Sequence, residues 1–201
     1  MRVIKLNTYL LTIVCFAALR QIRSVRWLLP TAAIKTQVVS LVLSKLDYGN
    51  ALLAGIPAVL LRRLQSVLNA AARTITGLPY SAHISSTLAE LHWLRAAERI
   101  KFKLATMMFR CLHGTAPRYL SVNFTRVADV PVRRRLRSST TNALIVQRTR
   151  LATVGDRAFP VAGANLWNSL PDEITSLDSL DTFRSQLKTH LFRISYPDFC
   201  C

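Results

Sequence analysis

The sequence predicts a mainly α-helical chain, one domain overall, with a small β-hairpin near residues 143–154. Apolar residues recur at helical spacing through several long stretches, and glycine and proline separate those stretches. Only residues 143–154 contain short runs of β-like composition. With 201 residues and 51% apolar content, the chain is long enough to bury about 70% of the surface that it exposes when unfolded. The sequence therefore predicts a folded protein.

Residues 1–29 are predicted to form an apolar and basic helix, with its regular part from about residue 9 to residue 26. The basic start and the apolar centre imitate a secretory signal peptide, but Asn7, Thr8 and Thr12 interrupt the apolar run. The run is also too short for a membrane span to be the favoured interpretation. We expect the apolar side of this helix to pack against the rest of the domain.

Residues 30–117 are predicted to form the helical core. Pro30 favours a helix start, and this helix is expected to stop near residues 47–50. An amphipathic helix of about five turns is expected from residue 60 to residue 75, because its apolar residues share one face, and Gly77 should end it. Two further helices complete the core, at about 86–91 and 96–113.

Residues 118–157 are predicted to form an arginine-rich loop and the small hairpin. The hairpin would pair 143–146 with 151–154, so that Arg148 and Arg150 project from its turn. Asp156 is expected to cap the helix that follows. Residues 158–201 would then contribute two helices, at about 157–169 and 180–192.

The net charge of +17 and the pI near 11.0 favour a polyanionic partner, with nucleic acid first and an anionic membrane second. The charge is uneven along the chain. Between residues 118 and 157, nine arginines stand against Asp129 and Asp156, a local balance of +7. Acidic residues outnumber basic ones from Pro171 onward. The sequence therefore predicts a central surface for the partner.

Guanidinium groups bind phosphates through paired hydrogen bonds and release condensed counterions, so arginines on an irregular segment predict contacts with a nucleic-acid backbone. The densest such segment, 133–137, also satisfies the loose pattern of a nuclear-localisation signal. The predicted nucleic-acid-binding residues are Arg133, Arg134, Arg135, Arg137, Arg148, Arg150, Arg62, Arg63, Arg99, Lys101 and Lys103.

The sequence predicts no catalytic residue, no metal site and no cofactor. Its four cysteines have neither zinc-site nor disulfide-scaffold spacing, which favours reduced thiols in a cytosolic or nuclear setting. The histidines are scattered, and we expect His92 to pack in the core beside Trp93. No motif of a serine hydrolase, a zinc protease or a glycine-rich phosphate loop is present.

Several strings of residues carry a resemblance to a known family. They are Leu91-His92-Trp93-Leu94 with Glu98-Arg99-Ile100, Arg110-Cys111-Leu112-His113-Gly114-Thr115-Ala116-Pro117, Gly155-Asp156-Arg157-Ala158-Phe159 and Leu166-Trp167-Asn168-Ser169-Leu170-Pro171. Upstream of them are the strings at 46–53 and 64–73. From about residue 15 to residue 199, the chain resembles the region behind the polymerase core in reverse transcriptases of LINE-type, jockey-like non-LTR retrotransposons.

The resemblance implies a parent protein that is an RNA-directed DNA polymerase, whose paired aspartates hold two metal ions. This chain has no Asp-Asp pair, and Asp47 is expected to be a helix-end or turn residue. We therefore expect no enzyme activity. The resemblance implies an accessory module that holds template RNA or target DNA, with the RNA or DNA backbone and the missing polymerase core as partners, in the nucleus or the cytoplasm.

Two alternatives remain open at this point. The chain could act as a protein-interaction or membrane-surface module, using the apolar N-terminal helix and its basic faces as an anchor. A membrane is a less favoured partner than nucleic acid. The chain could also be a decayed retrotransposon fragment without a selected activity.

Overall fold

The structure is a computed structural model that describes residues 2–129 and 142–199. Within these residues the protein is mainly α-helical, as predicted, and has no β-strand. The described residues form two compact units, one of 2–99 with 192–199 and the other of 100–129 with 142–191. The division falls inside the helices α6 (Ala96–Leu112) and α11 (Leu180–Ser195), whereas the sequence suggested four segments of one domain.

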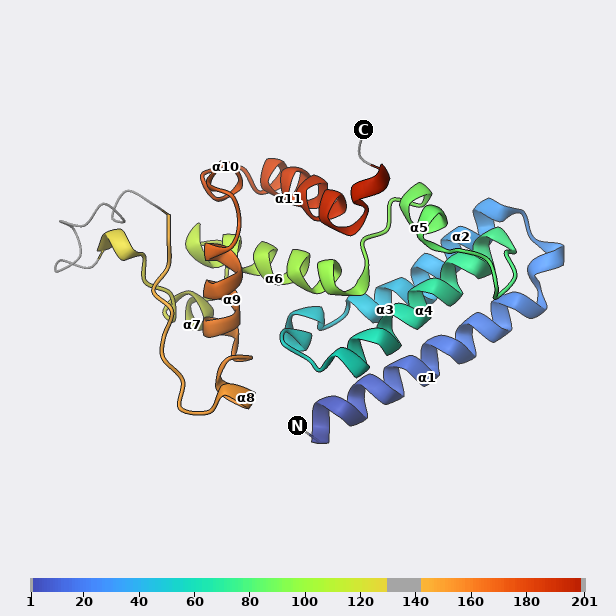
Figure 1. Cartoon of the computed structure of the whole chain (residues 1–201), viewed down its shortest axis with the longest axis horizontal. Helices are drawn as coiled ribbons and strands as arrows, with labels where there is room; N and C mark the ends of the chain where they lie inside the picture. Colours follow the sequence, from blue (N-terminus) through green and yellow to red (C-terminus); the bar gives the residue numbers. More distant parts are fainter. Residues whose placement is uncertain (1, 130–141, 200–201) are drawn as a thin grey trace. The chain divides into compact units, whose positions relative to one another are not determined.

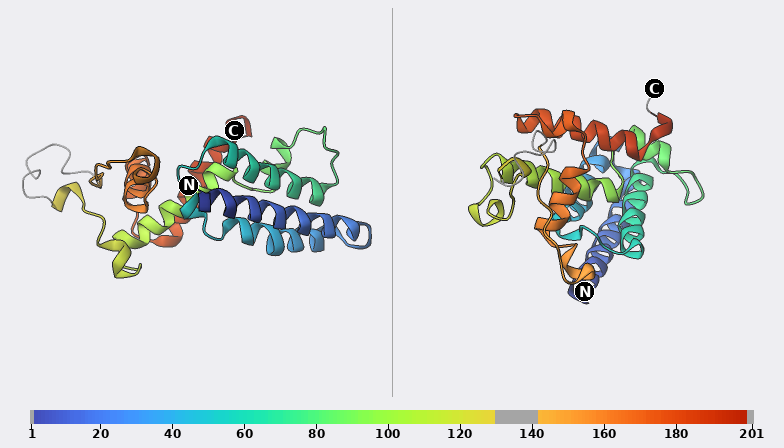
Figure 2. Two further views of the ribbon diagram at one scale, coloured as in Figure 1. Left: turned by 90° about the horizontal axis from the view of Figure 1, so that it is seen from below. Right: turned by 60° about the vertical axis from the view of Figure 1, so that its left-hand side comes forward.

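The first unit is built on three helical segments that lie side by side (Figure 1, Figure 2). The second segment begins after Pro30, and the third ends where Gly77 adopts the left-handed conformation at φ +78°, as predicted for both. The segments are α1 (Arg2–Ser24) with the 3-10 turn η1 (Arg26–Leu28); α2 (Thr31–Val38), the π-helical turn η2 (Val39–Leu43) and α3 (Ser44–Asp47); and α4 (Ala58–Thr76).

The helices α1 and α4 pack along each other in parallel. Near their starts, the Arg63 guanidinium lies 3.9 Å from the centre of the Tyr9 ring, and near their ends Arg23 Nε donates to Thr74 Oγ1 at 2.9 Å. The C-terminal ends of both helices are therefore close together. The buried residues of α1 are separated by alternating steps of four and three residues, which places them on one face of the helix, namely Thr8, Thr12, Cys15, Leu19 and Ile22.

The N-terminal helix begins earlier than predicted, at Arg2 instead of about residue 9. Thr8 and Thr12, which interrupt the apolar run in the sequence, are both buried on the packed face of α1. The hydroxyl group of Thr12 does not prevent burial, because its Oγ1 donates to the carbonyl oxygen of Tyr9 at 2.8 Å. None of the helices that the structure describes is long and apolar enough to cross a membrane.

The Leu91–Leu94 string ends the short helix α5 (Ser85–Glu90). His92 has φ +55°, its N–H donates to Ala89, and the N–H of Trp93 donates to Leu88 at 3.0 Å. These bonds form a Schellman motif, in which a left-handed residue reverses the chain after a helix. His92 is therefore exposed and not in the core as predicted, while Trp93 is turned inward and buried.

The second unit has an aromatic centre. Phe183 of α11 lies between Phe109 of α6 and Trp167 of α9, with ring centres 4.5 and 5.8 Å away. Gly163 of α9 allows a close approach, because a Cβ atom there would overlap the Met108 sulfur. The remaining elements are α7 (Arg118–Ser121), η4 (Val127–Asp129), α8 (Ala152–Gly155), α9 (Phe159–Asn168) and α10 (Asp172–Thr175).

The predicted hairpin near 143–154 is wrong. Leu144 instead makes an isolated antiparallel bridge with Arg126, and residues Ala152–Gly155 form a helical turn. The physical reason is the side chain of Asn168, which accepts the Leu144 N–H at 2.8 Å and donates to the Leu144 carbonyl at 2.9 Å. Both backbone groups that a neighbouring hairpin strand would need are therefore already paired.

The predicted helix-capping role of Asp156 is also wrong. The helix α9 has Ala158 at its N-cap position, without a side-chain cap. Asp156 Oδ1 instead accepts a hydrogen bond from Thr149 Oγ1, which closes the loop before α8. Pro160 lies in the first turn of α9, where the missing N–H costs no helical hydrogen bond.

Candidate nucleic-acid interface

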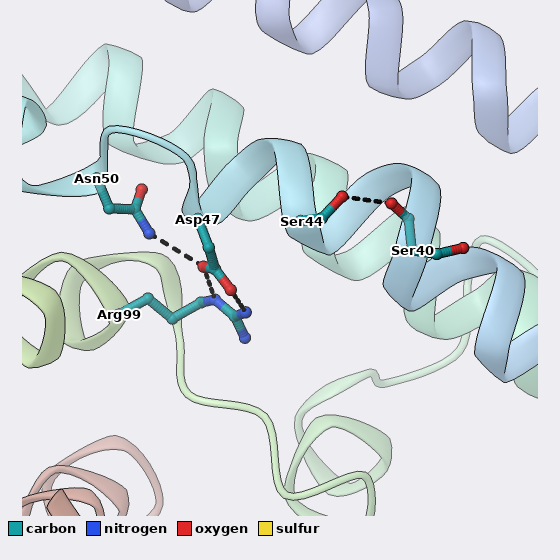
Figure 3. A network of polar contacts seen from close by, with 5 residues as sticks. All are labelled: Ser40, Ser44, Asp47, Asn50 and Arg99. Carbon is teal, nitrogen blue, oxygen red and sulfur yellow. Dashed lines mark hydrogen bonds and ion pairs between the residues drawn. The ribbon is translucent and has the colours of Figure 1, made fainter.

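Asp47 ends α3, as predicted, and its carboxylate is held by Arg99 (Figure 3). Arg99 Nε donates to Oδ1 at 3.0 Å, and Arg99 Nη2 donates to Oδ2 at 2.5 Å. Asn50 Nδ2 donates to Oδ1 at 3.1 Å. The Arg99 side chain is 16% exposed. Its guanidinium is thus paired with a carboxylate inside the first unit, so we leave Arg99 out of the interface that we propose below.

The other predicted basic residues on helices differ in exposure. Arg62 is exposed on α4, while its neighbour Arg63 is partly buried against the Tyr9 ring. Lys101 and Lys103 are exposed on the part of α6 that belongs to the second unit. These lysines and Arg62 therefore present charge to solvent, whereas Arg63 also joins α4 to α1 by a cation–π contact.

The arginines predicted in the central segment are only partly described. Arg148 and Arg150 are exposed in the loop before α8. The segment with Arg133, Arg134, Arg135 and Arg137 lies outside the described residues. Its role in phosphate binding stays a prediction.

A pocket in the first unit collects arginines that the sequence analysis did not single out. It lies where the C-terminal ends of α1 and α4 meet, and has a volume of about 330 Å³. This volume is far above the roughly 10–15 Å³ that one water molecule needs. Its lining residues are Arg23, Arg26, Arg73, Thr74, Gly77, Leu78 and Tyr80. We call this feature the arginine pocket.

The hydrogen bonds of the arginine pocket leave donors unused. Arg23 donates to Thr74 Oγ1 and to the Ala70 carbonyl at 3.3 Å, and Arg73 donates to the Ala82 carbonyl at 3.2 Å. The Nε atom of Arg73 is buried and has no acceptor among the residues that the structure describes. The Arg26 guanidinium likewise has no hydrogen-bond acceptor within 2–129 and 142–199. The guanidinium N–H groups that these bonds leave unused suit a ligand with acceptor atoms.

The charge of the pocket exceeds what the local helices require. The C-terminal ends of α1 and α4 each carry about −0.5 elementary charge, and basic side chains near such ends are a common structural device. Three arginines supply +3, and none of the lining residues is acidic. After the two helix ends are counted, a surplus of about +2 remains. The arginine pocket is therefore suited to an anion.

Gly77 brings the third arginine into the pocket. A Cβ atom on Gly77 would overlap the Arg26 guanidinium, so Arg26 occupies space that the absence of a side chain at Gly77 leaves open. The same residue needs the left-handed conformation that ends α4. Gly77 thus both ends α4 and leaves room for the Arg26 guanidinium in the pocket.

Tyr80 forms the outer edge of the arginine pocket. The Arg73 guanidinium lies 5.1 Å from the centre of the Tyr80 ring, which is within the range of a cation–π contact. The residue is 91% exposed. The ring therefore lies beside the Arg73 guanidinium while almost all of its surface contacts solvent.

Other chemistry-bearing groups do not form a site. The described residues contain no group of three or more histidine, cysteine or acidic residues that could hold a metal ion. Cys15 and Cys111 are buried, and burial raises the pKa of both thiols, which disfavours their reactive thiolate form.

The sequence contained only one indication of the arginine pocket. Between residues 1 and 89, Asp47 is the single acidic residue, so arginines in this stretch have few possible carboxylate partners. Asp47 takes Arg99. That Arg23, Arg26 and Arg73 converge follows from the parallel packing of α1 and α4, for which the sequence contained no direct signal.

A comparison of the chain with protein-family models, with curated proteins and with solved structures finds no match.

Proposed function

We propose that this chain is a nucleic-acid-binding module that contacts the phosphate backbone of RNA or DNA and has no enzyme activity of its own. The observation that carries the proposal is the arginine pocket, with three guanidinium groups and no acidic lining residue. Arginine binds phosphate with paired, charge-assisted hydrogen bonds. The net charge of +17 supports the same class of partner.

The resemblance of the motif strings to non-LTR reverse transcriptases supports an accessory role beside a polymerase. In this proposal the module would hold template RNA or target DNA, with the polymerase core as a second partner, in the nucleus or the cytoplasm. Exposed basic residues outside the pocket would add phosphate contacts. They are Arg62, Lys101, Lys103, Arg148 and Arg150, with the predicted segment at 133–137.

Fluorescence anisotropy with a labelled RNA or DNA, over a series of salt concentrations, tests the proposal. The variant Arg26→Gln with Arg73→Gln should bind all sequences more weakly. For each phosphate that the variant no longer neutralises, the slope of log affinity against log salt should shrink in magnitude by about 0.7 on a single strand and by about 0.9 on a duplex. A charge-matched control is Arg184→Gln with Lys188→Gln, two exposed positions on α11 that do not line the pocket.

The proposal fails if the wild-type chain binds no nucleic acid at low salt, or if the pocket variant and the control have the same slope. The same proteins can be tested for flotation with anionic lipid vesicles at matched salt. Flotation without nucleic-acid binding would favour the membrane-surface alternative, which the basic charge also allows.

A further inference from the structure

We propose that the arginine pocket and Tyr80 together bind a single-stranded segment, with a phosphate in the pocket and the neighbouring unpaired base stacked on the Tyr80 ring. The inference rests on the proposed function and assigns the ligand class. It concerns a residue that no charge-based argument would select.

The geometry of Tyr80 carries the first step. Tyr80 lines the arginine pocket, and the guanidinium of Arg73, which also lines it, lies 5.1 Å from the centre of the Tyr80 ring. A single exposed aromatic side chain is common on protein surfaces and needs no explanation. Here the ring is both 91% exposed and anchored by a phosphate-binding candidate. A base stacked on the open face would therefore lie beside the phosphate site.

The chemistry of stacking carries the second step. The face of a base is accessible to a side chain when the base is unpaired and leaves its own stack. Proteins that bind single strands combine a positively charged groove with aromatic rings on which bases stack, whatever the sequence. The arginine pocket supplies the charge and Tyr80 supplies the ring. A duplex can place a phosphate in the pocket but cannot offer a base face to Tyr80.

The backbone around Tyr80 carries the third step. The ring follows Gly77 and Pro79, and the N–H of Ala82 donates to the Pro79 carbonyl at 3.2 Å, which closes a turn around Tyr80. The Ala82 carbonyl accepts from Arg73, so this turn is also tied to α4. The ring is thus presented by an anchored turn at the pocket rim, which lowers the entropy cost of binding a base.

The test compares a labelled oligothymidylate strand with a duplex of the same length in an anisotropy assay. The variants are Tyr80→Ala, Tyr80→Phe and Arg26→Gln, with Tyr48→Ala as the control, because Tyr48 is 88% exposed in the same unit and does not line the pocket. We expect Tyr80→Ala to weaken single-strand binding about tenfold. Tyr80→Phe should keep the affinity, and duplex binding should not respond to either change.

The salt dependence separates stacking from charge. Tyr80→Ala should lower the affinity without changing the salt slope, whereas Arg26→Gln should change the slope. Wild-type single-strand affinity in Tyr80→Ala would overturn the inference, and a normal slope change in Arg26→Gln would leave the proposed function standing. Competition by inorganic phosphate at matched ionic strength should be weak. Competition as strong as that of unlabelled oligothymidylate would overturn the assignment to a nucleic acid.

Discussion

The ion pair between Asp47 and Arg99 should contribute about 2 kcal/mol to the stability of the first unit. Exposed pairs contribute about 0.2–1 kcal/mol, whereas breaking a fully buried pair costs about 3–5 kcal/mol. This pair lies between these limits, because the Arg99 side chain is 16% exposed and the Asp47 side chain is 44% exposed. Its two-point geometry and the third bond, from Asn50, place it above the surface range.

A double-mutant cycle measures this contribution. Asp47→Ala should destabilise the protein by about 2–3 kcal/mol, because it leaves the mostly buried guanidinium without its carboxylate. Arg99→Ala should cost slightly less, because the remaining carboxylate is half exposed. The double variant should cost less than the sum, with a coupling energy of about 1–2 kcal/mol. The pair would then act as a clamp between α3 and the start of α6.

Urea unfolding followed by tryptophan fluorescence is a suitable assay. The chain has three tryptophans, of which Trp93 is buried in the first unit, so Trp27→Phe with Trp167→Phe leaves one probe for that unit. Because the pair is partly buried, added salt should reduce the coupling without abolishing it. A coupling energy below about 0.5 kcal/mol would refute the reasoning, since it would match a solvated surface pair.

Three other predictions concern the second unit, the buried tyrosine and the central segment. Gly163→Ala should destabilise the protein by about 1–3 kcal/mol in thermal unfolding, because the new methyl group overlaps the Met108 sulfur. The double variant with Met108→Ala should cost less than the sum of the two single variants. Strict additivity would contradict the overlap. Burial raises the pKa of Tyr196, whose hydroxyl donates to the Trp93 carbonyl at 2.8 Å. The contribution of the Tyr196 phenol to the free energy of unfolding should be complete below pH 10.0, where the phenol is protonated in the folded and the unfolded protein. This contribution should be lost as the pH rises toward the folded-state pKa. Cys15→Ala and Cys111→Ala remove the two other groups whose pKa burial raises, and Tyr196→Phe in that background should remove the pH dependence of stability. An unchanged slope of stability against pH would exclude Tyr196 as its source. The last change replaces Arg133, Arg134, Arg135 and Arg137 together by glutamine. The slope of log affinity against log salt on duplex should then shrink in magnitude by about three to four units, without a change in the circular dichroism. An unchanged slope would mean that other residues make the phosphate contacts.

Local sequence signals were sufficient to predict most helices. Pro30 and Gly77 act through their own backbone restrictions, so the start of α2 and the end of α4 needed no tertiary information. The apolar spacing of residues 60–75 predicted the buried face of α4, since side chains three and four residues apart share one side of a helix.

The predictions failed where a distant side chain competed with a local preference. Residues near Leu144 have β-like composition, but the amide of Asn168, 24 residues away, takes both backbone groups of Leu144. His92 is next to a core tryptophan in the sequence, but its left-handed backbone conformation turns it to the outside. A pattern of neighbouring residues cannot represent either effect, because each depends on which backbone groups are paired in the folded chain.

The sequence by itself determined the helical class, the excess of positive charge and the scarcity of carboxylates before residue 90. Only the tertiary structure decided which cations have partners. The parallel packing of α1 and α4 brings Arg23 and Arg26 to Arg73, about fifty residues further along the chain, while Arg99 pairs with Asp47. The reason is that charge is a property of composition, whereas an anion site requires several charges at one point, and helix packing sets that point.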